Sequence, residues 1–195
     1  MFEQSPKLAE VLATHRSGDA EATHKLISVV YEKLRVLAHR YMKRENGYHT
    51  LQPTALVNEA CVRVLATKAP GWRGKTHLFA VAATQMRRIL VEHARAARTK
   101  KRGGRPAGIT LDENVAPTVD RTVELLALDE ALRRLERRSR RQSQVCELRL
   151  FAGMLVTEVA EVLGVSDKTV KRDWQLARAW LARELSRERP HGETS

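Results

Sequence analysis

The chain has 195 residues, 43% of them hydrophobic, and a formal net charge of +12. That length suits one large domain or two small ones, and so strong a positive charge indicates an anionic partner, either nucleic acid or a membrane surface. No stretch approaches the ~18–20 apolar residues that span a bilayer, and the N-terminus has no apolar run of signal-peptide type. We therefore expect no membrane partner and a cytoplasmic protein, in which Cys61 and Cys146 are buried free thiols.

Apolar residues recur at helical spacing through the first hundred residues. A short helix is expected over 6–17, a longer one over 22–41, a third from Pro53 to before Ala69, and a fourth from Lys75 to about Arg98. The expected buried stripe of the second helix comprises Leu26, Val29, Val30, Leu34, Leu37, Ala38 and Tyr41. No segment before residue 100 alternates in polarity as a strand would.

The composition changes at Thr99, and residues 99–121 contain three Gly and two Pro without a sustained period, which predicts a linker. A second helical block begins near Val123 and is followed by an arginine-rich break over 133–141, where six of nine residues are Arg. Three more helices are expected, over 142–151, 155–163 and 167–186. The predicted fold is therefore all-α: two small helical domains, 1–98 and 122–187, joined by a flexible linker over 99–121 and followed by a disordered tail, 188–195.

The segment from Val156 to Leu181 has the pattern of a helix-turn-helix, in which two helices are joined by a short turn containing Gly. Gly164 follows the first helix and Ser166 caps the second. Apolar residues line one face of the second helix: Val170, Trp174, Ala177 and Leu181. The residues expected to contact DNA are Ser166, Lys168, Thr169, Lys171, Arg172, Gln175 and Arg178. The alternative is an ordinary helical hairpin with a solvated basic face.

With these elements in order, the chain resembles a bacterial sigma factor of the extracytoplasmic-function (ECF) group. Four stretches carry the resemblance: LQPTALVNEACVRVLA (51–66), HLFAVAATQMRRILVEHARAARTKKRGG (77–104), LLALDEALRRLE (125–136) and the helix-turn-helix. The resemblance implies that the first domain binds the RNA polymerase clamp and opens the promoter at its −10 element, and that the second reads the −35 element. It also implies that the linker, with Asp112, Glu113 and Asp120, occupies a basic nucleic-acid path in the polymerase.

The resemblance carries two further sets of residues onto this chain. The polymerase-binding helix matches Leu56, Val57, Asn58, Glu59 and Arg63, although Glu59 and Arg63, at i and i+4, would also make a simple surface pair. The −10 reader matches the basic residues Arg87, Arg88, Arg95, Arg98, Lys100, Lys101, Arg102 and Arg105. A basic track of this kind suits the backbone of melted single strands.

The chain departs from the family's pattern at two positions. Arg88 stands where many members have Asn, four residues before the acidic position matched by Glu92, which leaves the base-capturing residue open. Leu155 stands where the family has Thr or Ser before the helix-turn-helix, and the missing cap is expected to cost about 1 kcal/mol unless Thr157 shifts the start of the helix. Trp72 and His77 are candidates for the promoter fork, although a tryptophan such as Trp72 is more often a core residue. The arginine cluster 133–141 is interpreted either as a DNA or polymerase contact or as a solvated helix end.

The expected partners are core RNA polymerase and promoter DNA, both double-stranded and melted, and the free chain is expected to be a monomer. The sequence leaves open an anti-sigma protein as a further partner. Scattered His residues without a nucleophile or ligand spacing indicate no enzyme, no cofactor and no metal. Two alternatives remain: a stand-alone helix-turn-helix regulator that binds DNA without polymerase, and an RNA-binding adaptor.

Overall fold

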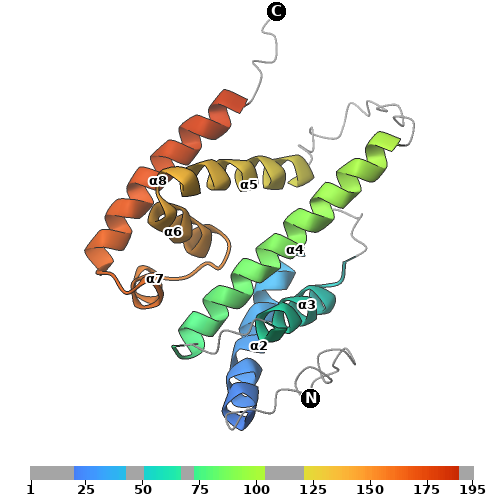
Figure 1. Ribbon diagram of the computed structural model, residues 1–195, viewed down its shortest axis with the longest axis vertical. Coiled ribbons are helices and arrows are strands. Elements are labelled where there is room, and N and C mark those ends of the chain that lie inside the picture. The colour runs from blue at the N-terminus through green and yellow to red at the C-terminus, as the bar shows by residue number, and fades with distance from the viewer. Residues whose placement is uncertain (1–19, 43–50, 67–72, 104–120, 189–195) are drawn as a thin grey trace, which may run out of the picture. The chain divides into compact units, whose positions relative to one another are not determined.

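The described residues of the chain are helical almost throughout (Figure 1). The computed structural model describes residues 20–42, 51–66, 73–103 and 121–188, where no strand occurs, so the predicted all-α class is confirmed. The helix expected over 6–17 lies outside these ranges. The seven helices within them are α2 (Ala20–Met42), α3 (Pro53–Ala66), α4 (Lys75–Gly103), α5 (Arg121–Arg138), α6 (Arg140–Leu150), α7 (Val156–Leu163) and α8 (Asp167–Glu188).

Tertiary contacts divide the chain into two units whose limits fall inside helices. The first unit combines Met1–Ile89 with Glu147–Arg172, and the second combines Leu90–Cys146 with Asp173–Ser195. The domain limits expected from the sequence stay predictions. Helix α4 continues to Gly103, so the first residues of the predicted linker are helical. The rest of that linker, with Arg105, Asp112, Glu113 and Asp120, lies outside the described residues, as do residues 189–195 of the expected tail.

The helices α2, α3 and the first half of α4 share one apolar core. The buried apolar residues of α3 form one wide face: Leu56, Val57, Ala60, Cys61, Val64 and Leu65. Three helices converge around a small apolar cavity lined by Val30, Leu34, Cys61, Val64, Leu78 and Ala82. This convergence accounts for the breadth of the buried stripe on α3, because that helix has neighbours on two sides.

Four residues of the expected α2 stripe are buried, Val30, Leu34, Leu37 and Ala38, whereas Tyr41 is half-buried and the side chain of Leu26 lies outside the described residues. Val29 is 55% exposed, which contradicts its predicted burial, whereas Tyr31, which the apolar pattern did not include, is 4% exposed. The hydroxyl of Tyr31 donates a hydrogen bond to Asn58 Oδ1 at 2.8 Å. Because this bond satisfies the hydroxyl group inside the core, the ring of Tyr31 can be buried although Tyr31 was not part of the expected apolar stripe.

The second unit holds α5, most of α6 and the greater part of α8. Ala131, Leu132 and Leu135 of α5 are buried, whereas Leu125, Leu126 and Leu128 are half-buried. The hydroxyl of Ser143 on α6 donates to the carbonyl of Leu132, 3.1 Å away, and joins α6 to α5. Ala177 and Leu181 supply the buried side of α8.

The expected arginine-rich break over 133–141 is wrong in extent. Helix α5 continues to Arg138, α6 begins at Arg140, and Ser139 alone separates them. Ser139 starts a new helix at this point, because its Oγ accepts the backbone N–H of Gln142 at 3.4 Å and caps α6. Arginine is a good helix former, so a run of arginines does not by itself end a helix.

Candidate nucleic-acid interface

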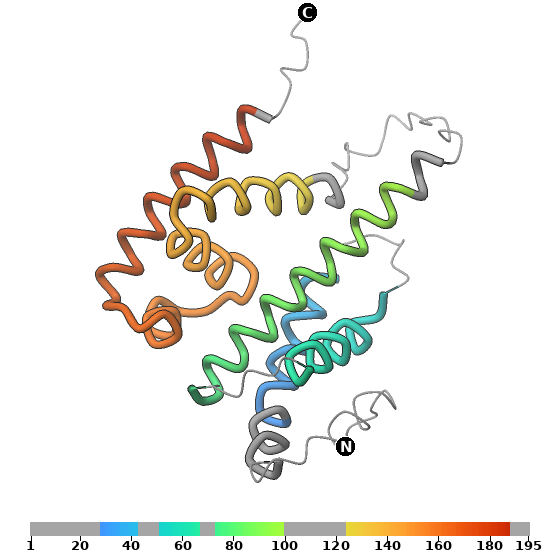
Figure 2. Tube along the Cα trace, in the orientation of Figure 1, coloured from blue at the N-terminus to red at the C-terminus, as the bar shows by residue number. Residues whose placement is uncertain are grey.

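Helix α8 is built as an amphipathic helix with a defined start. Ser166 precedes it, and the Ser166 Oγ accepts the backbone N–H of Thr169 at 3.2 Å, which confirms the predicted cap. Val170, Ala177 and Leu181 are buried on one side. The helix runs without interruption from Asp167 to Glu188 (Figure 2). Its inner face is therefore held in the core while its outer face meets solvent.

The turn before α8 follows the predicted geometry. Gly164 adopts φ 65° and ψ 38°, the left-handed region that glycine enters at little cost. The N–H of Val165 then bonds to the carbonyl of Ala160 at 3.1 Å, which closes the end of α7. The chain here has the order helix, three-residue turn, helix, and the assignment of this segment as a helix-turn-helix stays a prediction.

The start of α7 differs from the alternative that placed it at Thr157. Helix α7 begins at Val156, and Leu155 occupies the N-cap with no side-chain cap bond. Its own backbone N–H donates to Glu158 Oε2 at 2.7 Å. Glu158 therefore supplies one half of a capping box, and the other half is missing because leucine has no acceptor.

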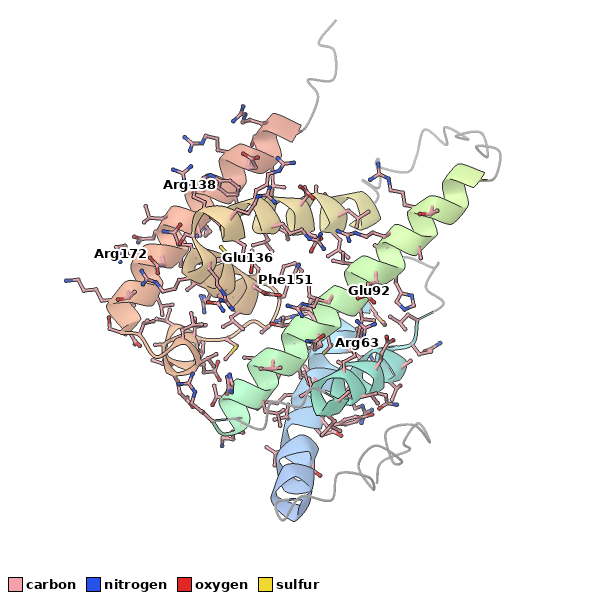
Figure 3. The ribbon with its side chains drawn as sticks, viewed as in Figure 1. Arg63, Glu92, Glu136, Arg138, Phe151 and Arg172 are labelled. Carbon is pink, nitrogen blue, oxygen red and sulfur yellow. The ribbon has the colours of Figure 1, made fainter. Side chains whose placement is uncertain are left out.

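The outer face of α8 carries most of the residues expected to contact DNA. Lys168, Lys171, Arg172, Gln175 and Arg178 are all exposed; Figure 3 labels Arg172 on this helix. The guanidinium of Arg178 lies 5.8 Å from the centre of the Trp174 ring, a cation–π contact that orders the side chain. Ser166 is exposed and Thr169 half-buried, and their hydroxyl oxygens lie 2.9 Å apart in the cap.

Neither interpretation of the arginine cluster 133–141 fits all of its members. Three arginines bind carboxylates within the second unit: Arg133 Nε lies 3.1 Å from Asp129, Arg134 Nη1 lies 2.6 Å from Glu184, and Arg141 Nε lies 2.5 Å from Asp173. The remaining arginines, Arg137, Arg138 and Arg140, are exposed, and in the part of the chain that the structure describes they form no ion pair. The cluster is thus divided between internal pairing and open surface.

Sequence analysis missed the buried carboxylates of this unit. Asp129 is 3% exposed and Asp173 is 1% exposed. Asp173 lies three residues after Val170 and four before Ala177, so it occupies the apolar stripe of α8. That register was visible in the sequence and is the signal that would have found it.

The −10 set on α4 is divided in the same way. Arg87 Nε lies 2.6 Å from Glu147 Oε1 with both side chains largely buried, and Arg95 Nη2 lies 2.9 Å from Asp129 Oδ2. Arg88 and Arg98 are exposed and form no ion pair with any described residue. Lys100, Lys101 and Arg102 continue the helix, but their side chains lie outside the described residues.

The polymerase-binding set on α3 is mostly interior. Leu56, Val57 and Asn58 are buried, and Asn58 accepts the Tyr31 hydroxyl. Glu59 and Arg63 are half-buried at the surface, where Arg63 Nη2 lies 2.7 Å from Glu59 Oε1. Two of the five residues therefore present polar groups to solvent.

The other candidates from the sequence are His77 and Trp72. His77 Nδ1 accepts the backbone N–H of Arg73 at 3.3 Å, and burial, followed by the nearby charge of Arg73, lowers the pKa of His77. Trp72 lies outside the described residues. Within the described residues there is no group of three or more His, Cys, Asp or Glu that could hold a metal ion. No described helix has the length and hydrophobicity needed to cross a membrane.

The order of helices and the basic outer face of α8 agree with a comparison to known protein families. The model of the ECF sigma factor family matches residues 5–187. The chain belongs to the ECF sigma factor family. No curated protein matches it. Members of this family act in transcription initiation and are regulators rather than enzymes. The family is associated with RNA polymerase and promoter DNA.

Proposed function

We propose that this ECF sigma factor binds core RNA polymerase and directs initiation by reading a −35 element with α8 and a −10 element with α4. The observation that carries the proposal is the division of α8 into a buried inner face and an outer face on which five polar residues, Lys168, Lys171, Arg172, Gln175 and Arg178, are exposed beside the apolar Leu176 and Ala179. A helix of this kind, preceded by a short capped turn, is the element that regulators insert into the major groove.

On α8, the residues suited to base contacts are polar residues exposed on its outer face. Lysine and arginine donate to guanine, and glutamine pairs with adenine, in the major groove. Lys171, Arg172 and Gln175 are exposed and fit these roles, with Gln175 about one turn after Lys171. Ser166 and Thr169, at the helix start, fit a phosphate contact, as do Lys168 and Arg178 at the sides.

On α4, the residues best placed to contact DNA directly are Arg88 and Arg98, which are exposed. Arg87 and Arg95 have carboxylate partners, and they would have to exchange these for phosphates on promoter binding. The exchange replaces one charge-assisted hydrogen bond by another. Lys100, Lys101 and Arg102 extend the same helix and complete the proposed −10 set.

On α3, the proposed polymerase contact is made at the surface by Glu59 and Arg63. Leu56, Val57 and Asn58 support it from inside, because they fix the helix against its neighbours. A polar rim around an ordered helix is the usual anatomy of a specific interface.

The test is binding of DNA in the presence and absence of core polymerase. Purified chain would be mixed with bacterial core polymerase free of sigma factors and with fragmented genomic DNA, then separated by size exclusion. We expect co-elution with core, and retention of a defined set of fragments only when both proteins are present. If the chain does not bind core polymerase but retains palindromic DNA without it, the chain is a stand-alone regulator. If it retains RNA alone, it is an RNA-binding adaptor.

A further inference from the structure

Helix α8 carries a buried carboxylate that faces away from the proposed DNA surface. Asp173 is 1% exposed on the inner stripe of the helix. Arg141, the second residue of α6, reaches it with two nitrogens: Nε lies 2.5 Å from Asp173 Oδ2, and Nη2 lies 3.5 Å from Oδ1. The side chain of Arg141 itself is 47% exposed.

A buried carboxylate needs a partner, because removing it from water without one strongly favours the unfolded state or the protonated group. The planar guanidinium of arginine meets a carboxylate in a fixed geometry, so the pair sets direction as well as charge. The hydrogen bond that Arg141 donates to the Asp173 carboxylate, followed by the negative charge of that carboxylate, raises the pKa of Arg141. The pair thus fixes the rotation of α8 about its own axis relative to α6.

A second arginine of the same cluster holds the far end of α8. Arg134 Nη1 on α5 lies 2.6 Å from Glu184 Oε1, a carboxylate that is only 17% exposed. Asp173 and Glu184 are separated by about 16 Å along the helix, at 1.5 Å per residue. Two attachment points at this distance limit both the rotation and the tilt of α8.

We propose that Arg141, assisted by Arg134, is a positioning residue for promoter recognition. It holds the α8 helix so that Lys171, Arg172 and Gln175 meet the base edges together. This inference rests on the proposed function, since it assumes that α8 reads the −35 element. It gives part of the arginine cluster a role other than DNA contact or solvation.

The competing role for Arg141 is a direct contact with a DNA phosphate, which its partial exposure allows. The two roles differ in what a neutral variant changes. Loss of a phosphate contact lowers affinity for all sequences alike and reduces the log–log salt slope by about 0.9. Loss of positioning lowers discrimination between the correct and a scrambled −35 element and leaves the salt slope unchanged.

The experiment uses the full chain bound to core polymerase and the promoter fragments that the wild type retains, each with its own or a scrambled −35 element. The variants are Arg141→Gln, Asp173→Asn and the double variant, which keeps a neutral hydrogen-bonding pair. The matched control is Arg140→Gln, because Arg140 is the exposed neighbour and its loss removes the same charge. Circular dichroism selects a temperature at which every variant is folded.

We expect Arg141→Gln to lower −35 discrimination about tenfold, within the range for one lost base contact. We expect Arg140→Gln to keep the wild-type discrimination. The double variant should recover much of the discrimination that Arg141→Gln loses, because residues 141 and 173 are coupled. Unchanged discrimination in Arg141→Gln, a reduced salt slope with discrimination intact, or strictly additive effects with Asp173→Asn would each overturn the inference. If wild type itself shows no preference for its −35 element, the proposed function fails instead.

Discussion

Tyr31 of α2 donates a hydrogen bond to Asn58 of α3 across 2.8 Å, and both residues are buried. It is a polar link inside an otherwise apolar core of α2, α3 and the start of α4. Asn58 belongs to the set carried over as polymerase-binding, and its side chain is directed to this link. We therefore expect Asn58 to contribute to polymerase binding indirectly, by holding α3 in position.

Removal of this hydrogen bond should destabilise the fold. In Tyr31→Phe the Asn58 amide loses its donor in the interior, and the free energy of unfolding should fall by about 1–3 kcal/mol. Urea denaturation followed by circular dichroism measures the change. The double variant Tyr31→Phe with Asn58→Leu is the control, because exchanging both partners for apolar groups should recover part of the loss. Equal stability of Tyr31→Phe and wild type would contradict the role of the bond.

The incomplete capping box of α7 predicts a stabilising substitution. Leu155 is 63% exposed, so little apolar burial is lost when it is replaced. Leu155→Thr adds the missing acceptor opposite Glu158 and should raise the free energy of unfolding by about 0.5–1 kcal/mol. Leu155→Ala, which has no acceptor, serves as the control. A gain that is the same in both variants would show that capping is not its cause.

The two buried thiols predict a loss of stability in alkali. Burial raises the pKa of Cys61 and of Cys146 to about 12, from an ordinary value of 9.0. The folded chain therefore keeps both thiols neutral, and this contribution is complete below pH 9 and lost as the pH rises toward 12. The urea concentration at the midpoint of unfolding should fall as the pH is raised from 9 to 11. In the double variant Cys61→Ala with Cys146→Ala, the fall from the variant's own midpoint at pH 8 should be smaller.

The same burial predicts slow thiol chemistry. At pH 8 a disulfide reagent such as Ellman's reagent should react with neither cysteine until the chain is unfolded, because the thiolate is the reactive form. Urea-unfolded chain provides the reference for full reaction. Rapid reaction of either thiol in the native protein would contradict the burial described.

The proposed −35 contact predicts a local effect of one lysine. Lys171→Ala should weaken binding of the polymerase complex to its promoter fragment by about 1–3 kcal/mol and relax the sequence requirement at one base pair. Arg183→Ala removes one exposed cation farther along α8 and should leave both quantities unchanged. Competition binding against fragments altered at single positions measures them. A uniform loss over all sequences would assign Lys171 to a phosphate.

Helix positions followed from the sequence because each helix buries one periodic apolar face. The observed starts of α3 at Pro53 and of α8 at Asp167 match the predictions, since proline and a Ser166 cap are local signals. The turn at Gly164 was predictable for the same reason. The exposed basic side of α8 also followed from the sequence, as the side opposite the apolar stripe.

The polar contacts between helices could not be predicted in this way. The inward position of Tyr31 depends on Asn58, and the buried position of Asp173 depends on Arg141, and neither partner is near in the chain. A periodic pattern identifies which face is buried, but it does not show which distant side chain neutralises a charge there. The extent of the arginine-rich break was misjudged because arginine is a good helix former, so that Ser139 alone separates α5 from α6.

The most direct test of the central claim is transcription in vitro. Core RNA polymerase, free of other sigma factors, would be supplied with the chain and with a linear fragment that the complex retains, and run-off RNA would be measured. The account predicts a transcript of defined start that requires the chain and disappears when the −35 or the −10 element is scrambled. Absence of a transcript from fragments that the chain binds, or a transcript indifferent to both elements, would contradict it.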